Sequence, residues 1–333
     1  MRKKLAEMMD RPRQLGPRLW HATAPQIPFR QLPGVKAFNR AASTLLLRRA
    51  LAQVGFQRYL SWFVAPDAGH LAGRIGEQMV IYYVTDNYAR FPGVDGAEIG
   101  RLDQALSRRA DQIFVSSKTL LEAKRELNPH VHHSPHGVDV ELFARASDPA
   151  TPPAGAAAGF KPPVIGFFGL IERWINLDLV AELAKARPQW TFLMIGRYAS
   201  PPHEIQRLPN VHFPGPQPYE TLPNWARCFD AAIIPYHLTY QVMNANPLKL
   251  REYLATGKPV VSVLTPDIEP FRHLVRIAST AGEFLEQLEA VLAGEDPEAR
   301  RQRQQAVAGL TWDARVEEIL SVVRSRMAAA RPL

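Results

Sequence analysis

Residues 248–261 read LKLREYLATGKPVV, and this stretch decides the fold class that we expect. A helix is expected to begin near Asn246-Pro247. Gly257 ends it, because glycine readily takes the left-handed conformation that commonly follows the last helical turn. A short apolar run, Pro259–Val263, then has the composition of a buried strand. A helix that leads directly into a buried strand predicts an α/β fold with a parallel sheet.

The same alternation continues on both sides of this segment in the C-terminal half. Apolar runs of strand length occur at Val164–Gly169, Trp190–Gly196, Val211–Phe213 and Ala231–Pro235, and helical stretches occur at Leu177–Ala186, Tyr219–Cys228, Phe284–Leu292 and Ala314–Met327. Strands that alternate with helices predict a parallel sheet covered by helices on both faces.

The N-terminal half has a similar but less complete pattern. Strands are expected at 60–64, 79–84 and 112–116, with a weaker candidate at 18–22, and helices at 38–53 and 96–110. Prolines and small residues without an apolar period fill 148–163, which is the composition of a linker. We therefore expect a Rossmann-like domain in residues 1–147, the linker 148–163, a second Rossmann-like domain in 164–310 and a terminal helix in 311–333.

Length and composition suit two globular domains. The chain has 333 residues, of which 46% are hydrophobic, and no stretch approaches the ~18 apolar residues of a membrane span. The basic start is followed by acidic residues and by Arg11-Pro12-Arg13, where a secretory signal would need its apolar core. The single cysteine, Cys228, excludes an internal disulfide and is interpreted as a core residue. These features predict a cytoplasmic protein that is soluble or peripheral on the inner face of the plasma membrane.

The net charge of +8 belongs entirely to the N-terminal half. Residues 1–147 contain 21 Lys and Arg against 13 Asp and Glu, whereas the remainder contains 19 of each. Such an excess attracts an anionic membrane surface or a phosphorylated acceptor, or it is simply a solvated surface. No nucleic-acid partner is expected, because the sequence lacks zinc-finger spacing and a basic region that leads into heptads. The expected helix 38–53 carries Arg40, Arg48 and Arg49 beside apolar residues, which fits either a helix on a membrane or one that covers a sheet.

Residues 248–261 resemble the donor-binding segment of GT-B glycosyltransferases, particularly family 4 and the bacterial exopolysaccharide and cell-envelope enzymes near it. Other segments resemble this family in the same order along the chain: Ser116–Leu120, Pro135–Asp139, Leu208–Val211, Leu222-Pro223, Phe229–Tyr236 and Thr311–Asp313. The resemblance implies a GT-B fold, in which two Rossmann-like domains with parallel sheets face each other across a cleft. It also implies a terminal helix that crosses back to the first domain.

The resemblance further implies a hexosyltransferase. Such an enzyme transfers a sugar from a nucleoside-diphosphate sugar to a glycan or lipid-linked acceptor, in polysaccharide, glycolipid or cell-envelope glycan synthesis. The helix that begins at Asn246-Pro247-Leu248 would direct backbone N–H groups and the positive end of its dipole towards the diphosphate. Lys249 adds a cation, and Glu252, on the same helical face, takes the role of binding the ribose hydroxyls. No metal or other cofactor is expected, since GT-B enzymes generally act without a catalytic metal.

Two departures from the family pattern change the expected donor contacts. Asn244 stands eight positions before Glu252, where family members usually have a second glutamate, so the contact with the transferred sugar becomes an amide hydrogen bond. The loop that starts at Gly169 lacks the usual Arg and Lys pair for the pyrophosphate. Arg173, Arg197 and Lys249 are the candidates for that task, because positive groups stabilise the developing charge of the leaving nucleoside diphosphate.

Asp86 is the candidate catalytic residue of the N-terminal domain. It follows the expected strand 79–84, where the family has an acidic or histidine residue beside the reacting sugar. In an inverting enzyme it would deprotonate the acceptor hydroxyl, and in a retaining enzyme it would position substrate; an Asx turn is the alternative. His132 and His133 are expected in a solvated loop. His136 is expected to shape a turn in which Gly137 allows a positive φ.

Nothing before Arg18 resembles the first strand and glycine-rich loop with which homologous N-terminal domains begin. The chain is therefore expected to lack that first βαβ element, which would leave a sheet edge and an apolar face uncovered. This gap keeps a second hypothesis open, a non-catalytic nucleotide-sugar-binding scaffold that partners another glycosyltransferase. A GT-B sugar-nucleotide epimerase is a third hypothesis, although the sequence offers no assignable carboxylates and histidine for it.

Overall fold

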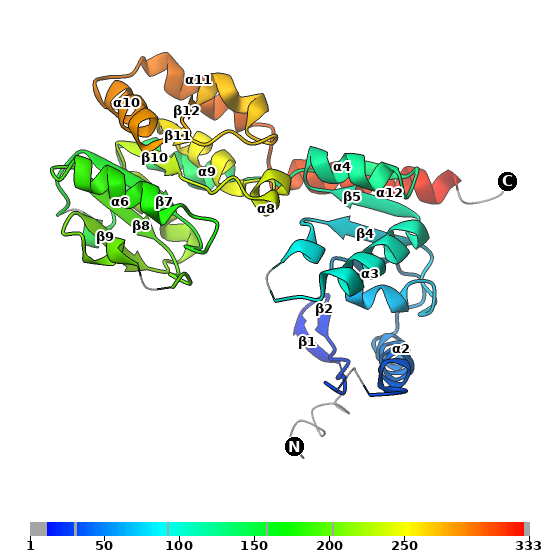
Figure 1. Ribbon diagram of the computed structural model, residues 1–333. Helices are drawn as coiled ribbons and strands as arrows, with labels where there is room; N and C mark the ends of the chain where they lie inside the picture. The colour runs from blue at the N-terminus through cyan, green and yellow to red at the C-terminus, as the bar shows by residue number, and fades with distance from the viewer. Residues whose placement is uncertain (1–11, 30–31, 92, 158, 202, 330–333) are drawn as a thin grey trace. The chain divides into compact units, whose positions relative to one another are not determined.

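The computed structural model describes residues 12–29, 32–91, 93–157, 159–201 and 203–329 (Figure 1). These residues form two compact units. The first unit contains the chain up to Val115, Leu120–His133 and the chain from Ser325 onwards, and the second contains Ser116–Thr119 and Ser134–Arg324. Each unit has its own parallel sheet, as expected for an α/β chain.

The second unit is built on a six-stranded parallel sheet. Its strands are β7 (Val164–Phe168), β8 (Thr191–Ile195), β9 (Val211–Gly215), β10 (Ala231–Ile234), β11 (Val260–Ser262) and β12 (Arg276–Ile277), in the order β12-β11-β10-β7-β8-β9. The chain runs outward from β7 to β9, returns to the middle and runs outward again from β10. This is the doubly wound Rossmann order, in which the winding reverses between the neighbouring strands β7 and β10.

Helices cover both faces of this sheet (Figure 1), and its central strands are therefore buried throughout. Alternate residues of one strand point to opposite faces. Phe167 and Ile233 therefore pack with α6 (Leu177–Ala186) and α10 (Ala281–Leu292) in one core. Phe168 and Ile234 pack on the other face with α5 (Val140–Ala144), α7 (Leu222–Ala226), α9 (Leu248–Thr256) and the end of α11 (Pro297–Val307).

The first unit contains a four-stranded parallel sheet in sequential order. Its strands are β3 (Ser61–Phe63), β4 (Val80–Val84), β5 (Gln112–Val115) and β6 (Val131–His133), and its helices are α2 (Val35–Val54), α3 (Gly96–Arg109) and most of α4 (Lys118–Arg125). Tyr82, Ile113 and Leu106 lie at the centre of its core. The last residues of α12 (Trp312–Ala329) belong to this unit, where Arg326 donates a hydrogen bond of 3.3 Å to the carbonyl of Asp111.

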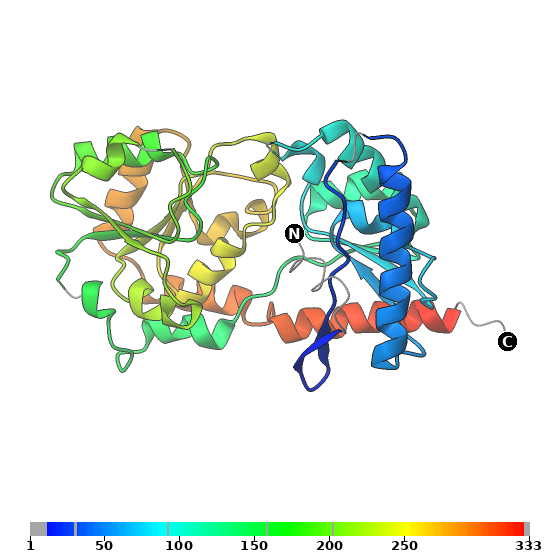
Figure 2. The same ribbon diagram turned by 90° about the horizontal axis from the view of Figure 1, so that it is seen from below.

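The long helix α2 runs along the first unit (Figure 2), and its fully buried residues are polar. Its buried residues are Asn39 and Ser43, and the Asn39 amide exchanges two hydrogen bonds of 2.9 Å with the backbone of Ile27. Phe38 and Leu45 are 59% and 68% exposed. Leu46, Leu47, Leu51 and Val54 of the same helix are half-buried, so its inward side also carries apolar side chains. None of the helices in the described ranges is both long and apolar enough to cross a bilayer.

The structure corrects several expectations from the sequence. The weak strand at 18–22 is β2 (Leu19–His21), which pairs antiparallel with β1 (Arg13–Gly16), a strand that the sequence did not predict. His132 and His133 lie in β6 and not in a loop. The expected helix 219–228 is a 3-10 turn at Tyr219–Thr221 followed by α7, and α4, α5, α8 (Tyr240–Asn244), α11 and β12 were missed. Most of these elements are too short to display a clear period. Part of the stretch expected to lack a first strand, residues 1–11, lies outside the described residues.

Candidate functional site

The loops after β7 and β8 meet at the carboxyl edge of the second unit's sheet, where the winding reverses. Gly169 follows β7 and Gly196 follows β8, with φ values of 142° and 138° that favour glycine. A Cβ on Gly196 would lie 1.8 Å from the carbonyl oxygen of Gly169, so the loops touch through bare backbone. Gly169 N–H donates to Ile195 O at 2.8 Å. Doubly wound sheets bind their ligands at this edge, beside the strands where the order reverses.

Lys249 lies directly over Gly169. A Cβ on Gly169 would lie 1.8 Å from Cε of Lys249 and 2.5 Å from its Nζ, so only glycine leaves room for this side chain. Lys249 is the second residue of α9, and Pro247, at the N-cap, offers the first turn no side-chain hydrogen bond. First-turn amides without a side-chain cap, the positive end of the helix dipole and an ammonium group therefore come together at one place, which favours a bound anion.

Glu252 is the acidic side chain one helical turn further along α9. It is 5% exposed, and burial raises the pKa of its carboxyl to about 7, although Lys249 and a hydrogen bond with Tyr219 both act to lower it. Burial also lowers the pKa of the Lys249 ammonium, while Glu252 acts to raise it. Both charges are costly to hold without hydration, so a ligand with hydrogen-bonding groups for both would reduce that cost.

Two tyrosines that the sequence did not single out contact the same carboxyl or lie near it. Tyr219 hydrogen-bonds to Glu252, and burial followed by the charge of Glu252 raises the pKa of the Tyr219 phenol. The pKa of Tyr236 is raised by the same two effects. Tyr236 directly follows Pro235 at the end of β10, so its place after a strand was a usable signal. Tyr219 lies in a 3-10 turn, for which the sequence carries no comparable signal.

The Asn246 side chain holds the start of α9 in place. Its Oδ1 accepts hydrogen bonds from His136 N–H at 3.2 Å and from Arg251 Nη1 at 2.8 Å, and its Nδ2 donates to Asp267 Oδ1 at 2.9 Å. Asn246 is also buried. The side chain expected to contact the donor is thus engaged within the protein, and it acts on the site by fixing the loop that leads into Pro247 and Leu248.

The other residues expected to contact the donor are Asn244, Arg173 and Arg197, and they differ in how exposed their side chains are. Asn244 ends α8, is 5% exposed and donates from Nδ2 to Tyr240 O at 2.6 Å. Arg173 and Arg197 are exposed on the loops after β7 and β8. These loops are joined by a hydrogen bond of 3.0 Å from Ile171 N–H to Arg197 O. The structure therefore brings Gly169, Lys249 and Glu252 together, while the two arginines lie on loops that border them.

Asp86 lies in the first unit, just after β4. It is half-buried, and burial raises the pKa of its carboxyl to about 6, against the opposing effect of a hydrogen bond from Thr85. A carboxyl with this pKa changes its charge close to neutral pH, which suits an acid or base in catalysis.

Gly137 is required for a different reason from the expected one. Its φ is not positive, but a Cβ at this position would lie 2.7 Å from Cα of Trp312. The neighbouring His136 ring has its centre 6.0 Å from that of the Trp312 ring. Burial, followed by the charge of Arg251, lowers the pKa of His136 to about 4, so this histidine is neutral at physiological pH. Its backbone N–H donates a hydrogen bond of 3.2 Å to Asn246 Oδ1, before the start of α9.

Comparison with known proteins identifies relatives of this arrangement. Residues 162–293 match the family model described as glycosyl transferases group 1. A protein of Bacillus subtilis (strain 168) described as "Putative teichuronic acid biosynthesis glycosyltransferase TuaH" is 30% identical over 253 residues, which are 69% of this chain and 61% of the relative. The chain thus spans about three fifths of that relative's length.

Solved structures with the same fold come from several glycosyltransferases. Sucrose-phosphate synthase from Thermosynechococcus elongatus matches with a TM-score of 0.70 at 16% identity, over 96% of this chain and 86% of that one. HepE of Anabaena in complex with UDP matches with a TM-score of 0.64 at 15% identity, over 89% and 83% of the two chains. The catalytic domain of starch synthase IV from Arabidopsis thaliana, bound to ADP and acarbose, matches with a TM-score of 0.60 at 11% identity, over 88% and 78%. These similarities confirm the expected GT-B fold.

We predict that Glu252→Gln makes the free protein more stable relative to wild type as the pH rises. Between pH 4.5 and about 7 the folded carboxyl keeps a proton that the unfolded chain releases, so the free energy of unfolding of the wild type falls with increasing pH. The glutamine variant lacks this loss, and it should gain about 2 kcal/mol on the wild type between pH 5 and pH 8. Urea unfolding at a series of pH values measures the difference. The exposed Glu286→Gln should show no such trend, and a flat difference for Glu252→Gln would contradict the prediction.

Proposed function

We propose that this chain transfers a sugar from a nucleoside-diphosphate sugar to an acceptor hydroxyl. The chain belongs to the GT-B glycosyltransferases, and its residues 162–293 match the family model of glycosyl transferases group 1. One observation carries the proposal. Lys249 lies over Gly169, with Glu252 one turn away, at the strand ends where doubly wound sheets bind nucleotides. HepE was solved in complex with UDP and starch synthase IV with bound ADP, which supports a nucleoside diphosphate as the leaving group.

In the proposed reaction the second unit holds the donor. The first-turn amides of α9 and the Lys249 ammonium meet the diphosphate, whose negative charge grows as the bond to the sugar breaks. Glu252 accepts hydrogen bonds from the two ribose hydroxyls, with Tyr219 orienting its carboxylate. Arg173 and Arg197 supply further positive charge from the neighbouring loops, and Asn244 contacts the transferred sugar. In this proposal cationic groups of the protein, without a metal ion or other cofactor, balance the charge of the leaving group.

The proposed acceptor is a growing cell-envelope glycan or its lipid-linked precursor. The description of the Bacillus subtilis relative names teichuronic acid biosynthesis, which supports a polysaccharide product. Asp86, whose carboxyl has a pKa raised to about 6, is the proposed acid or base on the acceptor side.

Lys249→Ala and Glu252→Ala should each weaken binding of nucleoside diphosphates at least about tenfold, because each removes a charged hydrogen-bonding group from the ligand. Calorimetry with a panel of nucleoside diphosphates, with a chelating agent present, measures the loss and tests the metal-free expectation. The exposed residues Lys185 and Glu286 provide matched alanine controls that should bind as wild type does. Unchanged affinity in both site variants would refute this assignment, and tight binding without turnover of any donor would favour a scaffold over an enzyme.

Asp86→Asn should lower the rate of sugar transfer by about 10²–10⁴ while leaving the affinity for the nucleoside diphosphate unchanged. In the wild type the transfer rate should fall as the pH drops through about 6, because protonation removes the base. Transfer assays with radiolabelled donor over this pH range measure both effects. Asp67→Asn, an exposed aspartate of the same unit, is the matched control. An Asp86→Asn variant with wild-type turnover would show that this carboxyl serves only as a turn residue.

The first unit is proposed to work at the inner, anionic face of the plasma membrane through α2. This helix exposes Phe38 and Leu45 together with Arg40 and Arg48, and residues 1–147 carry the entire net charge of the chain. An exposed apolar and basic helix face favours an anionic lipid surface, where apolar side chains enter the interface and arginines pair with headgroups.

Partition onto vesicles that contain anionic lipid should therefore weaken with added salt. The double variant Phe38→Ser and Leu45→Ser should reduce it at least about tenfold, since two apolar side chains no longer enter the lipid. Leu238→Ser, at an exposed leucine of the second unit, is the control and should partition as wild type does. Sedimentation with anionic and with zwitterionic vesicles separates the electrostatic contribution. Partition that is absent, or that the double variant leaves intact, would contradict the proposal.

A further inference from the structure

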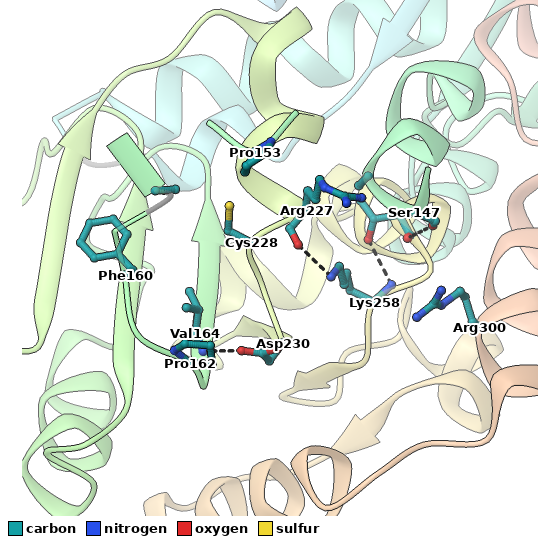
Figure 3. Close-up of a pocket in the computed structure, with 13 residues that line it drawn as sticks. Ser147, Pro153, Phe160, Pro162, Val164, Arg227, Cys228, Asp230, Lys258 and Arg300 are labelled. Atoms are coloured by element: carbon teal, nitrogen blue, oxygen red, sulfur yellow. Dashed lines mark hydrogen bonds between the residues drawn. The ribbon is translucent and has the colours of Figure 1, made fainter. Parts of the chain in front are cut away.

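A separate cavity of about 450 Å³ lies at the amino edge of the second unit's sheet (Figure 3). Val164 begins β7, Asp230 immediately precedes β10, and Lys258 precedes β11, and all three residues line this cavity. The site around Gly169 lies at the other end of the same strands. A strand of five residues rises by ~3.3 Å per residue, so roughly 15 Å of sheet separates the two places.

Three basic side chains and one acidic side chain line the cavity. The basic ones are Arg227, Lys258 and Arg300, and the acidic one is Asp230, so the local balance is three minus one, or +2. Burial lowers the pKa of the Lys258 ammonium; Asp230 opposes this effect, and the like charges of Arg300 and Arg227 add to it. Figure 3 shows the basic groups gathered at one end of the cavity. The cations are thus close enough to repel one another.

The Asp230 carboxylate already has a partner in the backbone, because its Oδ2 accepts a hydrogen bond of 2.7 Å from Val164 N–H. Lys258 Nζ donates to the carbonyl of Arg227 at 3.1 Å, and Arg227 Nη1 donates to the carbonyl of Asp148 at 2.7 Å. Within the described ranges, none of the three basic groups forms an ion pair with a carboxylate. Asp230 therefore balances their positive charge only in part.

The end of α9 does not account for these cations. A helix C-terminus attracts positive groups to its free carbonyls. Here Thr256 O accepts a hydrogen bond of 2.7 Å from Ser147 Oγ, and Gly257 O accepts from both Nε and Nη2 of Arg303, at 3.1 and 2.7 Å. Arg300 lies over the same turn, since a Cβ on Gly257 would approach its Cγ to 2.6 Å, but its guanidinium is not needed as a cap.

The opposite end of the cavity is apolar and comes from the segment expected as the linker. Pro153, Phe160 and Pro162 line it, and Phe160 is fixed by its ring contact with His212, at 4.5 Å between the ring centres. A pocket of this volume, with charged groups at one end and apolar walls at the other, suits a small ligand with an anionic head and an apolar body.

We propose that this cavity binds a small phosphorylated ligand, with its phosphate between Lys258, Arg227 and Arg300 and its body against Phe160 and the neighbouring prolines. A phosphate supplies the negative charge that the three cations lack and accepts several charge-assisted hydrogen bonds at once. Binding there joins the 148–163 segment to the strands of the second unit. The proposal is independent of the donor site, because it uses none of that site's residues.

Cys228 offers a local readout, because it lines this cavity and is the only cysteine of the chain. A ligand in the cavity should slow the alkylation of the Cys228 thiol by iodoacetamide. Mass spectrometry measures the rate of this reaction. The probes are inorganic phosphate and phenyl phosphate, each compared with sodium chloride at equal ionic strength. Binding of phosphate at the distant end of the strands would not shield this thiol. Stronger protection by phenyl phosphate supports a phosphate ester as ligand, and equal protection supports free phosphate at the same cations.

Arg300→Ala should require at least about tenfold more phosphate for the same protection, because one charged hydrogen-bonding partner is lost. Arg301→Ala is the matched control: this neighbouring arginine is exposed on the same helix, pairs with Glu298 at 3.4 Å and does not line the cavity. Both arginines are exposed, so both variants should fold, and unchanged binding of nucleoside diphosphates verifies this. Protection in the wild type no greater than with chloride, or equal protection in Arg300→Ala, would overturn the proposal.

Discussion

The Lys249 side chain crosses Gly169 with no room for a Cβ, and the organisation of the second unit depends on that contact. It requires a residue with positive φ directly after β7, and it brings the second residue of α9 to this strand end. The buried Tyr253 hydroxyl secures the same register, since it accepts a hydrogen bond of 2.9 Å from Phe168 N–H, one residue before Gly169. Two side chains of the helix, Lys249 and Tyr253, thus contact the backbone at the strand end.

Burial dominates the electrostatics of both units. It is the largest cause of the raised pKa of Glu252 in the second unit and of Asp86 in the first. In each case a hydrogen bond from a hydroxyl, Tyr219 or Thr85, only partly offsets the lost hydration. A carboxyl that is easily neutralised in the free protein becomes a stronger hydrogen-bond acceptor once a ligand brings positive or donor groups to it.

Helix α9 links two places with different chemistry. Its N-terminus presents backbone amides and Lys249, whereas its C-terminal end, at Gly257, is already capped by other side chains. Lys258 and Arg300 lie beyond that cap and line the cavity at the amino edge of the sheet.

The sequence by itself determined the α/β class and the alternation of strands and helices in the C-terminal half, and it singled out Gly169, Lys249 and Glu252, which the structure brings together. These depend on local signals, since long apolar strands, a glycine after a strand and the spacing along one helix are all visible in the chain. Short elements such as α8 and β12 were missed, and His132 and His133 were placed in a loop, because these elements span too few residues to show a period. The longer α11 was missed because its sequence is mostly polar, with Val307 as its buried apolar residue. Only the tertiary structure decided which groups share an environment. The contact of Tyr219 with Glu252, the internal use of Asn246 and the cavity around Lys258 join residues far apart in the chain, and burial, which sets their charges, exists only after folding.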